Sequence, residues 1–111
     1  MASLAWHAGD RWRVLELAAV TRIGRSLNAD VRFDDHVISR RHAIIVADDD
    51  GLWLSDDRSL AGTTLNEEPV KERMALQHGD VIGVGPYQLR FLAPVGQTQR
   101  ASQPEALSAV A

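Results

Sequence analysis

The stretch from Val37 to Ala43 reads V-I-S-R-R-H-A and places a hydroxyl, two guanidiniums and an imidazole immediately before an apolar run. That run, Ala43–Ala47, reads A-I-I-V-A and is typical of a buried strand. The polar stretch is therefore expected at the mouth of a strand whose other end is fixed in a core. Arginine and serine side chains held rigidly in this way suit the capture of a phosphate or a carboxylate.

The charge of the chain is unevenly distributed. Its 111 residues carry 12 basic and 15 acidic side chains, a formal net charge of −3. The window 21–42 holds five arginines and three aspartates, which makes that window +2 and the remainder −5. The acidic excess argues against general nucleic-acid binding, whereas a local basic zone suits a small anionic ligand. The alternative is that these arginines are scattered over the surface and pair with nearby aspartates.

Length and composition fit one globular domain, with 45% hydrophobic and 24% charged residues. The longest apolar run has five residues, so we expect no membrane-spanning segment. The first residues lack the basic and apolar regions of a secretion signal. The chain contains no cysteine, which excludes disulfides and cysteine chemistry and fits a cytoplasmic location.

Short β-branched and apolar segments alternate with turn residues along the chain. The segment 11–23 favours two strands with a break near Ala18, and Trp12, Val14, Leu15, Leu17 and Val20 are expected to form its apolar side. Further strands are expected at 31–33, 43–47, 52–54, 63–66, 70–71, 81–84 and 87–91. Many short strands without a long helix predict a β-sandwich or a β-barrel.

The domain organisation follows from where this pattern begins and ends. We expect an N-terminal extension over residues 1–10 and one domain over 11–93. Residues 94–111 are rich in Gln, Ser, Ala and Pro and bury too little apolar surface to offset their chain entropy. They are expected to form a flexible tail.

Five spaced motifs together resemble the forkhead-associated (FHA) domain family, over about residues 11–92. They are Ile23–Arg25, Val37–Ala43, Gly62–Asn66, Leu76–Ile82 and Gly85. The resemblance implies a sandwich of two sheets with about eleven short strands. It also implies that loops at one end bind a phosphothreonine in an extended segment of a partner protein.

The resemblance assigns roles to individual residues. Arg25 is expected to contact the phosphate, and Ser39 to donate a hydrogen bond to it. Arg40 either adds a further contact or points into solvent. His42 is expected to brace the loop from behind. The supporting positions are Gly24 and Gly62, which allow tight backbone geometry, and Thr63, which supports the binding loop through a hydrogen bond.

One departure from the family pattern affects the expected affinity. The second binding loop of the family typically reads Ser-Thr/x-Asn-Gly-Thr, whereas Ser59–Thr63 reads S-L-A-G-T. Ala61 stands where Asn would hold the backbone of the ligand, and Leu60 where a hydroxyl often assists the phosphate. If each lost hydrogen bond is worth about 1 kcal/mol, two losses weaken binding on the order of tenfold to thirtyfold.

Two functions remain open from the sequence. The first is a phosphothreonine-binding adaptor downstream of a Ser/Thr protein kinase, whose partner is a threonine-phosphorylated protein. The second is a degenerate FHA domain that binds a partner without phosphate, through the sandwich face or through the apolar tip made by Leu60 and Ala61. Neither function involves nucleic acid or a membrane.

Enzymatic activity and cofactor or metal binding are not expected. Ser39 and His42, three residues apart on an extended chain, would point to opposite faces, and no Gly-x-Ser-x-Gly elbow is present. The triple aspartate Asp48–Asp50 lacks the alternating oxygen ligands of a calcium loop and is instead expected to form a hairpin turn with Gly51.

Overall fold

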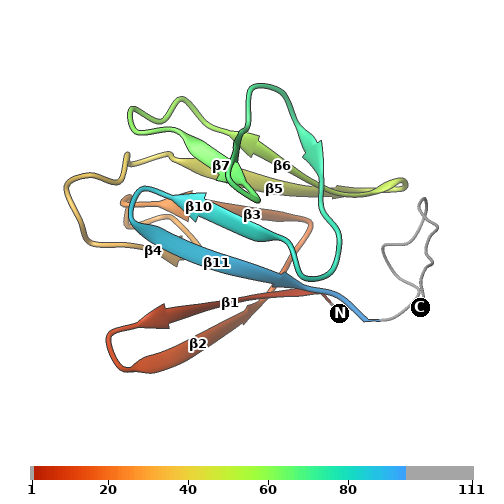
Figure 1. Ribbon diagram of the computed structural model, residues 1–111, viewed down its shortest axis with the longest axis horizontal. Helices are drawn as coiled ribbons and strands as arrows, with labels where there is room; N and C mark the ends of the chain where they lie inside the picture. Colours follow the sequence, from red (N-terminus) through yellow and green to blue (C-terminus); the bar gives the residue numbers. More distant parts are fainter. Residues whose placement is uncertain (1, 95–111) are drawn as a thin grey trace.

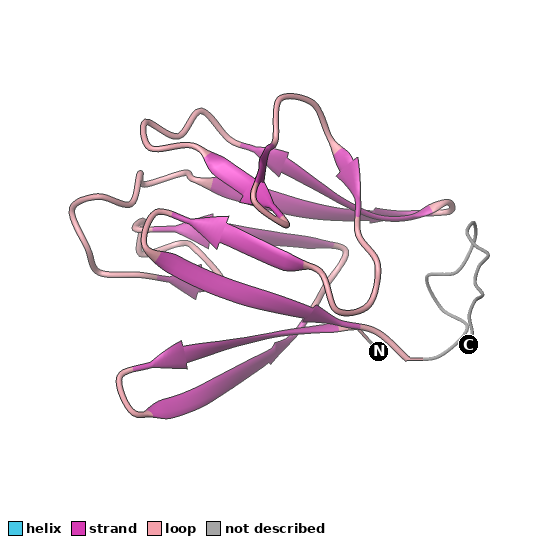
Figure 2. Ribbon diagram, in the orientation of Figure 1, coloured by secondary structure: helices cyan, strands magenta, loops and turns pink. Residues whose placement is uncertain are grey.

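The computed structural model describes residues 2–94, which form two β-sheets with no helix (Figures 1 and 2). The eleven strands are β1 (Ser3–Ala8), β2 (Arg11–Glu16), β3 (Val20–Gly24), β4 (Val31–Arg32), β5 (Ala43–Asp48), β6 (Gly51–Asp56), β7 (Thr63–Leu65), β8 (Glu68–Pro69), β9 (Met74–Ala75), β10 (Val81–Val84) and β11 (Tyr87–Leu92). The expected all-β sandwich with about eleven short strands is therefore confirmed.

The two sheets pack face to face. One has the strand order β2-β1-β11-β10-β7-β8 and the other has the order β4-β3-β5-β6-β9. Nearly all neighbouring strands run antiparallel, and only β3 and β4 pair in parallel. Long loops connect β3 to β4, β4 to β5 and β6 to β7, and Figure 1 shows them gathered at one end of the sandwich.

The core lies between the sheets, and strands such as β7, β10 and β11 give it alternate residues, as the period of two in a strand requires. In contrast, β2 and β8 contribute no buried residue. Fully buried aliphatic and aromatic side chains come from strands of both sheets and from one loop, namely Leu4, Ile23, Val31, Ile38, Ile45, Leu54, Ile82, Val84, Leu89 and Phe91. Ile38 differs from the others because it belongs to the β4–β5 loop and not to a strand.

The structure corrects the expected N-terminal extension. Ser3–Ala8 form β1, which pairs with β2 on one side and with β11 on the other. Leu4 and Trp6 of β1 are buried in the core, so this segment is integral to the larger sheet. The expected flexible tail falls, after Pro94, outside the described residues.

The break between the two strands of segment 11–23 is confirmed, but the prediction of its apolar side was wrong. Trp12, Val14 and Val20 are exposed, and only Leu17 is buried. Trp12 and Val14 lie opposite His7 and Ala5 of β1, on the face that points away from the core. Most of the apolar side chains of this segment therefore face solvent.

Two further strand predictions need correction. The apolar run 43–47 is only half buried, because β5 lies in an antiparallel sheet with one face toward solvent and presents Val46 on that face. Residues 70–71 form no strand. Instead, the short strands β8 and β9 lie on either side of them, where two-residue pairings leave no period for a sequence pattern to reveal.

An aromatic stack joins the β4–β5 loop to the larger sheet. The rings of Phe33 and Tyr87 lie parallel with centroids 4.3 Å apart, and Trp6 meets Phe33 edge-on. The Tyr87 hydroxyl donates a hydrogen bond of 2.7 Å to the Asp35 carboxylate. This bond lowers the pKa of Asp35 and raises that of Tyr87, since it favours the charged carboxylate and the neutral phenol.

Ile38 anchors the middle of the same loop. Its side chain is fully buried, and its Cδ1 atom lies so close to Gly85 that a Cβ there would sit 2.7 Å away. The β10–β11 turn thus closes over Ile38 because residue 85 is a glycine with φ of 57°. The neighbouring Val37 is 51% exposed.

We expect Ile38→Ala to lower the free energy of unfolding by about 2–5 kcal/mol, because it removes a buried branched side chain and leaves a cavity. Val37→Ala, one residue earlier on the same loop, should change stability by less than about 1 kcal/mol. Urea denaturation of both variants measures the difference. Equal losses in the two variants would show that Ile38 does not anchor the loop.

Candidate ligand-binding site

The candidate site lies where the β3–β4, β4–β5 and β6–β7 loops meet at one end of the sandwich (Figure 1). Each loop continues directly from a strand that is fixed in the core, so its first and last residues have little freedom. Every residue that the sequence proposed for the site, from Gly24 to Thr63, lies on these loops or at the adjoining strand ends.

Gly24 allows direct backbone contact between the β3–β4 loop and the β4–β5 loop, the first and second loops of the site. The amide of Arg25 donates to the carbonyl of Ser39 at 3.0 Å, and the amide of Ser26 donates to the carbonyl of Arg40 at 3.2 Å. A Cβ atom on Gly24 would lie 2.1 Å from the Arg40 carbonyl oxygen, well inside any real contact. Glycine is therefore required here for close approach of two backbones.

Arg25 is held in place by part of its guanidinium. Its Nε donates to the carbonyl of Ile38 at 3.0 Å, which orients the rest of the planar group. Within residues 2–94 neither terminal nitrogen of Arg25 takes part in a recorded ion pair. A half-buried guanidinium with its outer nitrogens available is suited to a bidentate contact with an oxyanion.

Ser39 connects the β4–β5 loop to the β6–β7 loop. Its Oγ accepts a hydrogen bond of 3.0 Å from the amide of Leu60. Because the hydroxyl is an acceptor in this bond, its own proton remains available for donation to a ligand. Arg25 and Ser39 thus offer donors from adjacent positions, since the backbones of these two residues are hydrogen bonded to each other.

His42 is fully buried behind these donors and braces both loops. Its Nδ1 accepts from the amide of Ser39 at 3.1 Å, and its Nε2 lies 2.9 Å from the carbonyl oxygen of Gly62. A carbonyl only accepts, so Nε2 carries the proton and the ring is the neutral Nε2–H tautomer. The expectation that Ser39 and His42 point to opposite faces was wrong, because the chain bends at residues 40 and 41 and both side chains reach the β6–β7 loop.

Asp56, the last residue of β6, holds the β6–β7 loop (the third loop of the site) in its conformation. Its carboxylate accepts from the amide and hydroxyl of Ser59 and, at 2.7 Å, from the hydroxyl of Thr63. The Ser59 hydroxyl in turn accepts from the amide of Gly62 at 2.9 Å. Burial raises the pKa of Asp56, but the hydrogen bonds from Ser59 and Thr63 outweigh burial and lower it below 3.8.

The tip of the third loop is apolar and exposed. Leu60 is 96% exposed, and Ala61 beside it is also exposed. Gly62 follows with φ of 91°, a backbone conformation that glycine adopts without strain. The tip of this loop thus carries an isobutyl and a methyl group, which form no hydrogen bond.

A basic hollow lies beside the donors. It is a pocket of about 300 Å³ whose polar lining consists of Arg22, Ser26, Asn28, Arg40, Arg41 and Asp57. Arg41 and Asp57 form a two-point ion pair at 3.2 and 3.3 Å, which leaves a net excess of two guanidiniums around the opening. Arg40 is exposed at this rim, so both of its expected roles remain compatible with its position.

Several residues that shape the site are not identifiable as such from the motifs. Asp56 and Ser59 had a usable signal, because an aspartate followed three residues later by a serine is a common local hydrogen-bonding pattern in loops. Ile38, Ser26 and Asn28 had none. Their roles depend on which loops become neighbours, and this is decided by the pairing of β3 with β4 and β5.

The hairpin at Asp48–Asp50 is held together by hydrogen bonds and an ion pair to the Asp48 carboxylate. Asp48 Oδ1 accepts from the amides of Asp50 and Gly51 and from the indole nitrogen of Trp53, at 2.8–3.1 Å. Arg73 pairs with Asp48 at 3.6 Å and lies over the Trp53 ring at 4.1 Å. The hairpin expected from these residues is confirmed by the pairing of Asp48 with Gly51.

The fold and the site together define a class of protein. The chain is a β-sandwich binding module that presents cationic and hydroxyl donors from loops at one end. The family model of the FHA domain matches residues 21–85, and the chain belongs to the FHA domain family. FHA domains are binding modules, so the chain is not an enzyme.

Relatives and solved structures agree with this assignment. The glycogen accumulation regulator GarA of Mycobacterium tuberculosis is 36% identical over 86 residues, covering 78% of this chain and 51% of the relative. An oxoglutarate dehydrogenase inhibitor of Corynebacterium jeikeium is 40% identical over 86 residues, covering 78% and 58%. An FHA domain solved for the analysis of phosphothreonine-dependent interactions superposes with a TM-score of 0.73 at 33% identity, covering 84% of this chain and 96% of that one.

The chain spans about half the length of the curated relatives it matches. Among the residues described, 2–94, no helix is long and apolar enough to cross a membrane.

We expect Gly24→Ala to separate the first two loops, since its Cβ cannot occupy the space 2.1 Å from the Arg40 carbonyl oxygen. The amides of Arg25 and Ser26 should then exchange with solvent at least about tenfold faster, because their carbonyl partners move away. Hydrogen exchange followed by NMR measures this, with Ser26→Ala as the control. Unchanged protection of the Arg25 amide would contradict the close-approach argument.

Asp56 should make the third loop sensitive to acid. Its pKa in the folded state is lowered, so the ionised carboxylate stabilises the fold above the unfolded value of about 3.8. This stabilisation is lost as the pH falls through the lower folded pKa. The stability difference between the natural chain and Asp56→Asn should therefore be largest near pH 7 and shrink below about pH 3.8, as measured by urea denaturation across pH. A difference that is independent of pH would contradict this role.

Proposed function

We propose that this chain is a phosphothreonine-dependent protein-binding module that uses Arg25 and Ser39 as its phosphate clamp. The observation that carries the proposal is the arrangement of their donors. Arg25 is oriented through Nε alone, and Ser39 accepts from Leu60 with its own proton to spare. A phosphate dianion at this position receives charge-assisted hydrogen bonds from both side chains.

The rigidity of the clamp supports binding without large rearrangement. His42 fixes the backbone of Ser39 from behind, and Gly24 lets the Arg25 backbone reach the same loop. Donors that are already positioned lose little conformational entropy when a ligand binds. Arg40 at the rim adds positive charge near the incoming anion.

We propose that this chain holds the backbone of a bound peptide only weakly. A phosphate contact alone fixes one end of a peptide, and a side-chain amide in the third loop would hold its backbone further along. Ala61 is exposed at that position and supplies no donor or acceptor. We therefore place the affinity about fivefold below that of the same site with one more hydrogen bond, and about thirtyfold below that with two.

The proposed partner is a threonine-phosphorylated protein, and a Ser/Thr protein kinase acts upstream of it. We place the phosphorylation of the partner and its binding by this chain in the cytoplasm. The relatives' names describe a regulator of glycogen accumulation and an inhibitor of an enzyme, which supports a regulatory partner.

The second candidate function is phosphate-independent binding of a protein partner through the same loops. It is favoured by Leu60, which is 96% exposed beside Ala61 and gives the third loop an apolar tip. In this case Arg25 and Ser39 would serve only to hold the loops together. The two functions differ in whether binding requires the phosphate.

Titration of a degenerate phosphothreonine peptide library, with its unphosphorylated form as control, distinguishes them. We expect the natural chain to bind only the phosphorylated library and Arg25→Ala to lose this binding. Lys71→Ala removes the same charge outside the three binding loops and should leave the affinity within about twofold. Ala61→Asn should strengthen it by about fivefold to thirtyfold.

Two results would overturn the proposal. Equal binding of both libraries by the natural chain and by Arg25→Ala would establish the phosphate-independent function instead. Binding by Ala61→Asn alone would show that the clamp is intact and the natural site is disabled.

A further inference from the structure

Among the residues that the structure describes, the sandwich has one long open sheet edge. The outermost strands of the two sheets are β2 and β8 in one and β4 and β9 in the other. Strands β4, β8 and β9 have two residues each, and β8 contains Pro69, which cannot donate to another strand. In contrast, β2 has six residues and no proline. Short or proline-containing edges resist pairing with another chain, whereas a long regular edge favours it.

The register of β2 shows which backbone groups face outward. The amide of Leu17 donates to the carbonyl of Ala2, and this extends the pairing of Ser3 with Glu16. Hydrogen bonding to the neighbour alternates along an antiparallel strand, so residues 11, 13 and 15 also bond to β1. The amides and carbonyls of Trp12, Val14 and Glu16 therefore point away from the sheet, ready to pair with an added strand.

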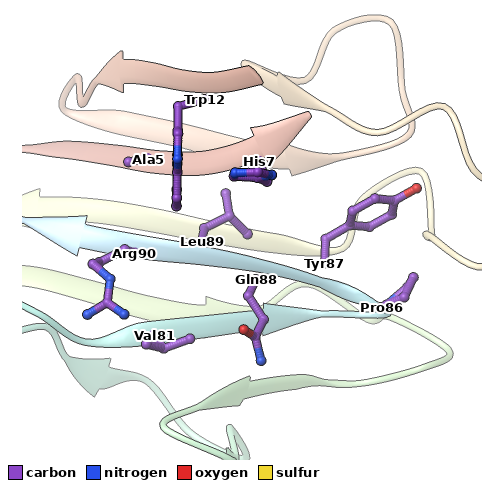
Figure 3. A pocket seen from close by; sticks show the side chains of 9 residues that line it. All are labelled: Ala5, His7, Trp12, Val81, Pro86, Tyr87, Gln88, Leu89 and Arg90. Atoms are coloured by element: carbon purple, nitrogen blue, oxygen red, sulfur yellow. The ribbon is translucent and has the colours of Figure 1, made fainter. Parts of the chain in front are cut away.

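One face of this edge is apolar. The side chains of Trp12 and Val14 are 64% and 66% exposed, although tryptophan and valine are usually buried. Figure 3 shows Trp12 reaching across β1 beside His7, and the two rings meet edge-on with centroids 4.4 Å apart. They form one wall of a pocket of about 370 Å³ that also includes Arg90. An added strand would place alternate apolar side chains against Trp12 and Val14.

The other face of the edge is basic. Arg11 and Arg13 are exposed on the face that carries Leu15, near the turn of the β1–β2 hairpin, which projects from the sandwich in Figure 1. The ion pairs recorded among residues 2–94 are Arg32–Asp34, Arg41–Asp57 and Arg73–Asp48, so neither arginine has a carboxylate partner there. An added strand with carboxylates on this face would supply both.

A second copy of the chain is a poor occupant of this edge. Antiparallel pairing of two β2 strands that continues the sheet places residues of the same face opposite each other. Arg13 would then meet Arg11, Arg13 or Leu15 of the copy, because Glu16 lies on the opposite face. Two of these registers place arginines directly opposite each other, which is destabilising, and the third sets Arg13 against Leu15 without a carboxylate partner. An acidic strand supplies carboxylates to both arginines in every register, so it is the better occupant.

We propose that β2 is a second docking site, which accepts by strand addition an extended, unphosphorylated segment of a partner protein that alternates acidic and apolar residues. Backbone hydrogen bonds to Trp12, Val14 and Glu16 supply the pairing. The carboxylates of the segment meet Arg11 and Arg13, and its apolar residues cover Trp12 and Val14. This site is independent of the phosphate clamp, since none of its residues lies on the three binding loops.

The test uses the full chain and a short unphosphorylated peptide in which glutamate and valine alternate. On titration, NMR should show shifted and exchange-protected amides at Trp12, Val14 and Glu16. The double variant Arg11→Glu/Arg13→Glu should weaken binding at least about tenfold and gain binding of the matched lysine–valine peptide. The control Lys71→Glu should stay within about twofold, and Arg25→Ala should bind the acidic peptide as the natural chain does.

Val14→Pro provides a second, backbone-based test. It removes an outward amide that bonds to nothing within the sheet, so the fold should persist while peptide binding is lost. The proposal is overturned if the acidic peptide shifts no β2 amide or if Lys71→Glu weakens binding as much as the arginine variant. It is also overturned if sedimentation shows a dimer that Val14→Pro abolishes, because β2 would then pair with a second copy. Loss of phosphopeptide binding in Arg25→Ala leaves this test unaffected, so the two sites are judged separately.

Discussion

The buried imidazole of His42 is the contact on which the binding end depends. One ring nitrogen accepts from the backbone of Ser39 and the other donates to the backbone of Gly62, so a single side chain sets the spacing of two loops. A buried ring with both nitrogens satisfied has no alternative position of comparable energy, because any displacement leaves polar groups without partners. The proposed phosphate donors therefore rest on a rigid support and not on mobile loop ends.

The remaining contacts of the site extend this support outward. Gly24 joins the first loop to the second through two backbone bonds, and Asp56 closes the third loop on itself. Most of these bonds use backbone amides and carbonyls as partners. The exposed tip at Leu60 and Ala61 is therefore held through the amides of Leu60 and Gly62, whatever side chains it carries. The side chains of Leu60 and Ala61 take no part in the hydrogen bonds that hold the loop.

The sandwich separates two kinds of surface. Three arginines and the loop donors concentrate positive charge at one end, where an anion suits them. The long edge strand β2 instead offers backbone groups that no other strand within residues 2–94 pairs with, between an apolar and a basic face. A domain of this size thus has room for a clamp that reads a modification and an edge that reads an extended sequence, as we propose, without shared residues.

Sequence alone determined most of the longer strands, the family, and the identity of Arg25, Ser39, His42 and Ala61 as residues of interest, because these depend on local periodicity and on motif spacing. Tertiary structure decided which loops touch, the tautomer of His42 and the burial of Ile38. It also decided that the side chains of Trp12 and Val14 face solvent, and that residues 3–8 form a strand of the larger sheet. The physical reason is that a strand's period of two gives the alternation but not its phase. Only the packing of one sheet on the other determines which face is buried.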